Sequence, residues 1–213
     1  MATDLLKKLE NKKISKEKFA EKIQQDYKIL PEIINAMDSN KAAVRYGCGK
    51  VLMDLSETNT IKLYPFMDNF ITYLDSKYRI INWQAMAIIS NLTKVDKKKK
   101  FDEIFEKYYS FINDEYMVTV ANVVGHSGKI ALAKPYLIPK ITEKLLSVDK
   151  IKTTPHLTKE CKLVIAEKAI ESFDLFFEKT NQKEKIISFV KKFSISSRKS
   201  LKTKARDFLK KWT

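Results

Sequence analysis

A recurring apolar pattern is the feature that most limits what this chain can fold into. At two places an Asp-Ser pair is followed, six positions after the Asp, by an apolar residue that begins a run in steps of four. The run is large, then small, then large. Residues four apart lie on one face of an α-helix, and a small middle residue lets a neighbouring helix approach closely. The two segments therefore predict two similar, closely packed helices. They comprise Asp38 with Val44, Cys48 and Leu52, and Asp75 with Ile81, Ala85 and Ile89.

The same frame occurs three more times, and its first positions are separated by 37, 36, 48 and 36 residues. A near-constant period of this length is typical of repeat architectures, in which each unit buries its apolar face against its neighbours. The one long interval predicts an insertion loop over 148–158, and four lysines at 97–100 predict a turn between repeats. The further frames are Met117, Ala121, Gly125, then Ile165, Ala169, Phe173, then Leu201, Ala205, Leu209.

A second apolar helix precedes each frame, so each repeat is predicted to be a pair of helices. We name the first helix of a pair helix A and the second helix B. Ser39, Ser76 and Asn113 lie between paired segments, where turn and N-cap residues belong. The chain has only four Gly and five Pro, too few for the many tight turns of β-sandwiches and barrels. The predicted helices A cover 30–37, 63–74, 101–112, 136–146 and 184–193.

The sequence therefore predicts a single all-α domain over residues 1–213. Residues 1–26 are expected to form an N-terminal helical cap, with a helix start near Ser15. The last helix is very polar outside its apolar stripe, as suits a terminal cap, and Trp212 continues that stripe into the predicted core. The five predicted repeats span 27–60, 61–96, 97–132, 133–180 and 181–213.

An Asp, then an apolar residue with Arg beside it, then a small residue, resembles the HEAT-repeat family of armadillo-like α-solenoids. Asp38, Val44, Arg45 and Cys48 match this signature in the first repeat, whereas the second repeat has Asn82 in place of the Arg. The resemblance implies a right-handed α-solenoid of about five helical hairpins. It also implies a binding surface rather than catalysis, with helices B lining a concave face.

The charge of the chain is strongly positive, at +15 with a sequence pI near 9.6. Of 41 basic residues only four are Arg, although proteins that recognise phosphates and bases usually favour Arg with its planar fork of donors. An AT-rich genome would supply the same excess of Lys through its codons. Selection for a polyanionic partner is the other explanation, and both stay open.

No pattern in the sequence indicates catalytic chemistry. There is no Gly-rich phosphate loop, no convincing acid–base pair or nucleophile, and Cys48 and Cys161 are too far apart for the usual zinc spacing. We therefore expect no enzyme activity, no cofactor, no metal site and no small-molecule substrate. The beginning of the chain lacks the apolar core of a secretory signal, and no apolar stretch reaches a membrane-spanning length. These features predict a cytoplasmic protein without a membrane partner.

Polar and aromatic residues on the predicted helices B are the candidate partner-binding residues. A basic ridge on the last helix could contact phosphates, or could be a solvated face. The segment Gly125-His126-Ser127-Gly128 is either a notch at a binding groove or a site of tight helix packing. The candidates are Arg45, Tyr46, Asn82 and Trp83 on the first two helices B, Asn122 and His126 on the third, and Arg198, Lys202 and Arg206 on the ridge.

Two functions are compatible with these sequence features. The first is a non-catalytic scaffold that binds a macromolecular partner, most simply a protein, on its concave face. The alternative is a nucleic-acid-binding solenoid, whose extreme form would be a DNA-alkylation-repair glycosylase built from HEAT-like repeats. That family implies an Asp one helical turn from a Trp. Here Ala87 follows Trp83 by four positions, and no residue stands four beyond Trp212, so the catalytic match fails at both.

Overall fold

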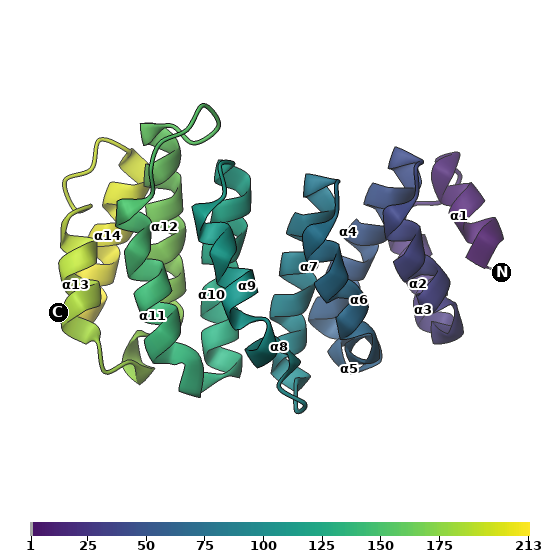
Figure 1. The fold of residues 1–213 in the computed structure, drawn as a ribbon, viewed down its shortest axis with the longest axis horizontal. Coiled ribbons are helices and arrows are strands. Elements are labelled where there is room, and N and C mark those ends of the chain that lie inside the picture. The colour runs from purple at the N-terminus through teal and green to yellow at the C-terminus, as the bar shows by residue number, and fades with distance from the viewer. Residues whose placement is uncertain (1) are drawn as a thin grey trace. The chain divides into compact units, whose positions relative to one another are not determined.

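Helices make up nearly all of the regular structure in the computed structural model, which describes residues 2–213. Among these residues the one exception is an isolated bridge between Thr154 and Leu157. The chain separates into two compact units, one ending at Glu103 and one beginning at Ile104. In Figure 1 the first unit runs from purple to blue and the second from teal to yellow.

The N-terminal unit contains two cap helices followed by two helical pairs. The second cap helix begins at the predicted position, because the side chain of Ser15 accepts a hydrogen bond from the backbone N–H of Lys18 at 3.3 Å. Leu9 of the first cap helix packs directly over Gly47 in the first helix B. The helices are α1 (Ala2–Glu10), α2 (Lys16–Gln25), α3 (Leu30–Asn35), α4 (Ala42–Thr58), α5 (Thr60–Leu63), α6 (Met67–Thr72), α7 (Arg79–Leu92) and α8 (Lys100–Glu103).

The second helix A differs from its prediction as one continuous helix over 63–74. α5 ends at Leu63, a 3-10 turn spans Tyr64–Phe66, and α6 begins at Met67. Pro65 lies inside this turn and explains the break, because it has no backbone N–H and its ring clashes with the preceding helical turn. A single repeat here therefore holds three helical pieces, within the range seen for HEAT and armadillo repeats.

The C-terminal unit contains three helical pairs that stand side by side (Figure 1). The predicted insertion loop folds back onto the start of the first helix B in this unit. The Thr154 hydroxyl donates to the Glu115 carbonyl at 2.7 Å, and the His156 ring stacks on Tyr116 with 4.3 Å between centroids. The helices are α9 (Phe105–Ser110), α10 (Met117–Ala133), α11 (Ile138–Leu146), α12 (Lys159–Phe176), α13 (Lys183–Lys191) and α14 (Lys199–Trp212).

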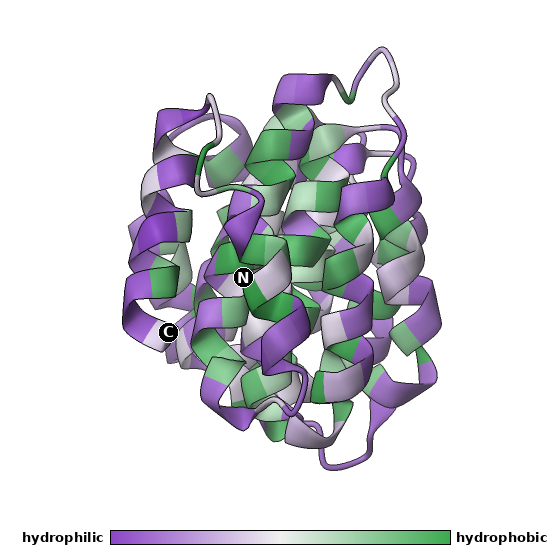
Figure 2. Cartoon of the chain, turned by 90° about the vertical axis from the view of Figure 1, so that its left-hand side faces the viewer, coloured by the Kyte–Doolittle hydropathy of each residue, from purple (hydrophilic) through white to green (hydrophobic). Residues whose placement is uncertain are grey.

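The apolar frame marks the buried face of most helices B, and Figure 2 shows hydrophobic and hydrophilic segments alternating along the helices. The middle positions Cys48, Ala85, Ala169 and Ala205 are all fully buried. A small residue at each of these places lets neighbouring helices pack closely, as the pattern predicted. In α14 the buried stripe turns slightly, because Phe208 is buried and Leu209 only half-buried.

The frame predicted for the third repeat is wrong by two residues. Its members on α10 are half-buried rather than buried, and the buried frame begins two positions later. The predicted residues were Met117, Ala121 and Gly125, and the buried ones are Thr119, Val123 and Ser127.

The turn before α10 shows why the register was misassigned. Ser39, Ser76 and Asp114 each accept a hydrogen bond from the backbone N–H two residues further along, so they are equivalent positions. Five residues after each of them the buried frame begins, which in the third repeat places it at Thr119. Both outer members of this frame, Thr119 and Ser127, carry hydroxyl groups, so a search for large apolar residues missed them.

The buried hydroxyl of Ser127 is tolerated because it is hydrogen-bonded on both sides. It donates to the Val123 carbonyl at 2.8 Å and lies 3.1 Å from the hydroxyl of Tyr109. Burial raises the pKa of Tyr109 above its ordinary value, although the hydrogen bond with Ser127 opposes this shift. At this position a buried hydrogen-bonded hydroxyl therefore takes the place that an apolar side chain has in the other repeats.

Candidate partner-binding groove

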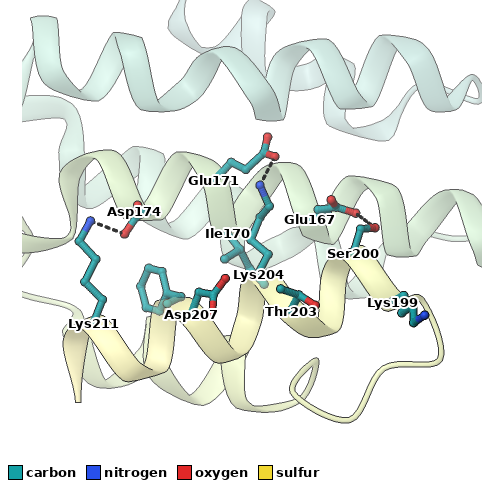
Figure 3. Close-up of a pocket in the computed structure, with 11 residues that line it drawn as sticks. Glu167, Ile170, Glu171, Asp174, Lys199, Ser200, Thr203, Lys204, Asp207 and Lys211 are labelled. Atoms are coloured by element: carbon teal, nitrogen blue, oxygen red, sulfur yellow. Dashed lines mark hydrogen bonds and ion pairs between the residues drawn. The ribbon is translucent and has the colours of Figure 1, made fainter.

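A groove of about 800 Å³ runs between α12 and α14 on the helix-B face of the C-terminal unit (Figure 3). Ile170 of α12 and Phe208 of α14 supply its apolar floor, and both side chains are buried. Ser200 and Thr203 of α14 add hydroxyl groups, and both residues are exposed. We call this feature the α12–α14 groove.

Charged side chains from both helices line the rim of the α12–α14 groove. Glu171 of α12 pairs with Lys204 of α14 at 2.5 Å and with Lys168 of its own helix at 2.8 Å. Asp174 pairs with Lys211 at 3.0 Å (Figure 3). Burial acts to raise the pKa of Glu171, but hydrogen bonds from the two lysines outweigh it and hold that pKa below its ordinary value.

Two of the basic side chains in the predicted ridge on α14 already make contacts within the unit. Arg198 donates to Glu160 at 2.7 Å and to Glu167 at 3.0 Å, and these two carboxylates raise the pKa of its guanidinium. Arg206 donates to the carbonyl of Ser194 at 3.1 Å. Lys202 is half-buried and forms no ion pair among the residues that the structure describes. The ridge is therefore not a continuous row of available charges.

Arg45 and Asn82 hold the turns of their repeats together. Arg45 is only 5% exposed, donates to the Ser39 carbonyl at 2.6 Å, and stacks over the Tyr78 ring with its guanidinium carbon 3.6 Å from the centroid. The Asn82 amide donates at 3.0 Å to the carbonyl of Ser76, and also to those of residues 73 and 74. Asn thus replaces Arg in the repeat signature because both side chains reach the carbonyl six residues earlier.

The remaining sequence-predicted candidates lie partly inside the fold. Tyr46 is 37% exposed, and its hydroxyl accepts a hydrogen bond from Arg45 at 3.2 Å. Trp83 and His126 are half-buried. Asn122 is also half-buried, and its amide donates to the Val118 carbonyl at 2.8 Å. None of these four residues is among those that line the α12–α14 groove.

Three of the four glycines serve close packing between helices. A Cβ at Gly128 would lie 3.0 Å from the Ser172 carbonyl oxygen and 2.6 Å from a Leu175 methyl carbon, and one at Gly47 would lie 2.9 Å from Leu9. A Cβ at Gly49 would collide with the side chain of Gln84. Gly125 differs, because its nearest neighbour would be Lys168 Cδ at 3.6 Å. Of the two interpretations of the segment 125–128, tight packing therefore accounts for Gly128.

None of the sequence-predicted candidates lines the α12–α14 groove. A usable signal was present, because four carboxylates recur along α12 at intervals that keep them on one helical face. A helix with an acidic face beside a helix rich in lysine indicates pairing between them. The four carboxylates are Glu160, Glu167, Glu171 and Asp174.

An Asp and a Trp do meet in this unit, although from different helices. The indole N–H of Trp212 donates to Asp174 at 2.6 Å, at the same carboxylate oxygen that pairs with Lys211. Trp212 was predicted to be core and is instead half-buried, with its ring packed against Phe177 at 5.0 Å between centroids. The Asp174 carboxylate is thus engaged by two donors that fasten the end of α14.

The two cysteines are in different surroundings. Cys48 is fully buried in α4, and burial raises the pKa of its thiol to about 12. Cys161 is half-buried in the first turn of α12, where its sulfur lies 3.3 Å from the Thr158 hydroxyl. Both are free thiols. Within residues 2–213 no three metal-ligating side chains come together as a possible metal site.

Comparison with known proteins identifies the fold. No family model matches the sequence, and no curated protein matches it. Among solved structures, the chain is similar to a designed armadillo repeat protein, YIII(Dq)4CqI, with a TM-score of 0.64 at 14% identity. The similarity covers 98% of this chain and 92% of the designed one. The fold is an armadillo-like α-solenoid.

This match confirms the all-α repeat architecture that the sequence predicted. The armadillo-like arrangement places helices B of successive repeats next to one another, which is how α12 and α14 come to frame a groove. None of the described helices is both long and apolar enough to cross a membrane.

Proposed function

We propose that this protein is a non-catalytic armadillo-like scaffold that binds an extended segment of a partner protein in the α12–α14 groove. The observation that carries the proposal is the combination in one groove of an apolar floor, at Ile170 and Phe208, with charged groups of both signs along the rim. An apolar floor with a few well-placed polar groups is the usual composition of a binding site.

The rim pairs are suited to exchange with a partner. Lys204 and Lys211 are partly exposed, and exposed ion pairs contribute about 0–1 kcal/mol each to stability. A partner can therefore replace them at little cost, offering its own carboxylates to the lysines and its own cations to Glu171 and Asp174. Such charge complementarity mainly sets specificity and the rate of association.

Site-specific cross-linking in cells tests the groove. A photo-reactive residue is placed at Thr203, which is exposed in the groove, and at Thr72 on α6 as the control. We expect a discrete protein adduct from position 203 that position 72 does not give. Exchanging the charges by Glu171→Lys with Lys204→Glu keeps the pair between the helices but changes the pattern offered to a partner, and should reduce the adduct. The absence of an adduct specific to position 203, or an adduct that contains only nucleic acid, contradicts the proposal.

A nucleic-acid partner is the second candidate, and the segment 191–213 favours it with nine basic residues against one acidic residue. Binding of this kind depends on phosphate contacts and falls steeply with salt. Lys202→Glu with Arg206→Glu should then weaken binding of duplex RNA or DNA by a similar factor for every sequence, measured by fluorescence anisotropy. If the wild-type protein binds neither duplex at low salt, this candidate is eliminated.

A further inference from the structure

A second hollow, of about 370 Å³, lies in the C-terminal unit, near the turns that join α11 to α12 and α13 to α14. It is formed by the first half of α12, the 3-10 turn η8 (Ser147–Lys150), and the chain that follows α13. None of its lining residues belongs to the α12–α14 groove. We call it the η8–α12 pocket.

The inner surface of the η8–α12 pocket is apolar and incompletely covered. Val148 and Ala166 are buried, whereas Leu163 and Phe193 are only half-buried and present carbon surface to the hollow. Its volume exceeds that of any single side chain, so it can take one large apolar side chain together with part of its main chain. Burying such a side chain is favourable by about 1.5–3 kcal/mol.

The rim of the pocket carries uncompensated positive charge. Lys159 and Lys162 are one turn apart on α12, and neither forms an ion pair or side-chain hydrogen bond with another described residue. Asp149 is the one carboxylate among the lining residues, and it pairs with Lys192. Glu160, beside Lys159 in the chain, pairs with Arg198. The nearby carboxylates are thus already satisfied, which leaves both lysines able to bind an external anion.

We propose that the η8–α12 pocket docks an acidic segment of a partner protein, with one large apolar side chain held between Leu163 and Phe193 and flanking carboxylates on Lys159 and Lys162. This inference rests on the proposed function as a protein-binding scaffold, and adds a second docking place together with the chemistry of what it takes.

Two other anionic partners fit the observations less well. A nucleic-acid backbone has no group for the apolar interior, and Arg198, five residues after Phe193 in the chain, is already paired with two carboxylates. A membrane of anionic lipid is the stronger competitor, because Ile195 protrudes from the turn after α13 and is 82% exposed. A hollow, however, accepts an apolar group, whereas membrane binding needs one that projects. The pocket geometry therefore favours a peptide.

The test uses the whole protein and a fluorescein-labelled peptide of about ten residues, in which one Phe is flanked on both sides by Asp and Glu. Binding is followed by fluorescence anisotropy at low salt. Lys159→Glu with Lys162→Glu should weaken binding about tenfold or more, because two attractions become repulsions. The control is Lys16→Glu with Lys18→Glu on α2, which makes the same change in net charge on exposed lysines of the other unit and should bind like the wild type.

A second peptide, with Gly in place of the Phe, tests the apolar interior and should bind about tenfold more weakly. Thermal melts followed by circular dichroism establish that every variant is folded. Equal peptide affinity of the two double-lysine variants would overturn the inference, and so would indifference to the loss of the Phe. Binding to phosphatidylserine vesicles or to duplex RNA, without binding to the peptide, would also overturn it.

The two proposals can fail separately. Cross-linking of a partner from Thr203 without peptide binding would leave the α12–α14 groove standing and remove the η8–α12 pocket. Peptide binding that depends on Lys159 and Lys162, without any adduct from Thr203, would do the reverse.

Discussion

Gly128 allows α10 and α12 to pack with their backbones close together. A Cβ at this position would meet the end of the Leu175 side chain at 2.6 Å and, at 3.0 and 3.1 Å, two atoms of the Ser172 backbone, which cannot rotate aside as a side chain can. The Ser172 hydroxyl also donates to the Val124 carbonyl at 2.6 Å, which ties the two helices together next to the glycine. Any side chain at position 128 must therefore push the helices apart or distort one of them.

The two glycines of α10 give a matched pair of variants. Gly128→Ala should lower the free energy of unfolding by about 1–3 kcal/mol, because overpacking outweighs the gain in helix propensity. Gly125→Ala should raise it by up to about 1 kcal/mol, because a Cβ there has room and Ala is the better helix former. Urea denaturation measures both. A stable Gly128→Ala variant would show that α10 and α12 can separate freely.

At the scale of the element, α14 is fastened to α12 by a small apolar contact and a row of charged groups. Leu201, Ala205 and Phe208 are its buried residues, and its polar side chains reach α12 at several points along its length. Its attachment therefore depends on pH more than that of a helix with a wide apolar face.

Glu171 gives this dependence a defined direction. Its pKa is lowered in the folded protein, so its contribution to stability is present above the unfolded pKa of about 4.3 and is lost as pH falls through the folded value. Glu171→Gln should therefore melt at a lower temperature than the wild type near pH 7, and the two should converge near pH 3. A difference in melting temperature that stays constant down to that pH would show that the ion pairs of Glu171 contribute no stability.

The helices could be predicted from sequence to a large extent, because the frame repeats and because turn residues separate the paired helices. The misassigned register of α10 has a physical cause, since Thr119 and Ser127 are buried as hydrogen-bonded hydroxyls and resemble surface residues. The break between α5 and α6 follows from Pro65, which stands at the third position of the helix predicted over 63–74 and lies in a 3-10 turn between two helices.

The candidate sites were far less predictable. Arg45 and Asn82 were assigned to a partner because charge and polarity on a helix suggest exposure, whereas the fold uses them to bind turn carbonyls. The contacts of the α12–α14 groove join residues more than thirty positions apart, such as Glu171 and Lys204. Only the packing of one repeat on the next brings these side chains together, and a single sequence does not show which faces will meet.

At the scale of the whole molecule, a net charge of +15 acts against compaction. Like charges repel one another across distances comparable to the Debye length, which is about 30 Å at 0.01 M salt and about 10 Å at 0.1 M. The ion pairs described above are mostly exposed and individually weak. General repulsion should therefore outweigh them in the overall response to salt.

Raising NaCl from about 0.01 M to about 0.1 M should consequently raise the melting temperature, because screening relieves the repulsion over this range. Differential scanning calorimetry measures the change, and dialysis into each buffer controls for bound ions. A melting temperature that falls with salt would mean that local pairs such as Arg198 with Glu160 and Glu167 outweigh the net charge.

The two thiols differ in burial, so one position of the chain can be labelled selectively without any substitution. Cys48 is buried and stays protonated, so a maleimide should modify Cys161 alone in the native protein and both thiols in denaturant, as counted by mass spectrometry. Modification of both in the native state would mean that α4 opens readily. A dye on Cys161 would lie in the first turn of α12, on a different face of the helix from Lys159 and Leu163, which line the η8–α12 pocket. The unaltered sequence thus provides an optical reporter on α12, the helix whose lysines are expected to hold an acidic partner.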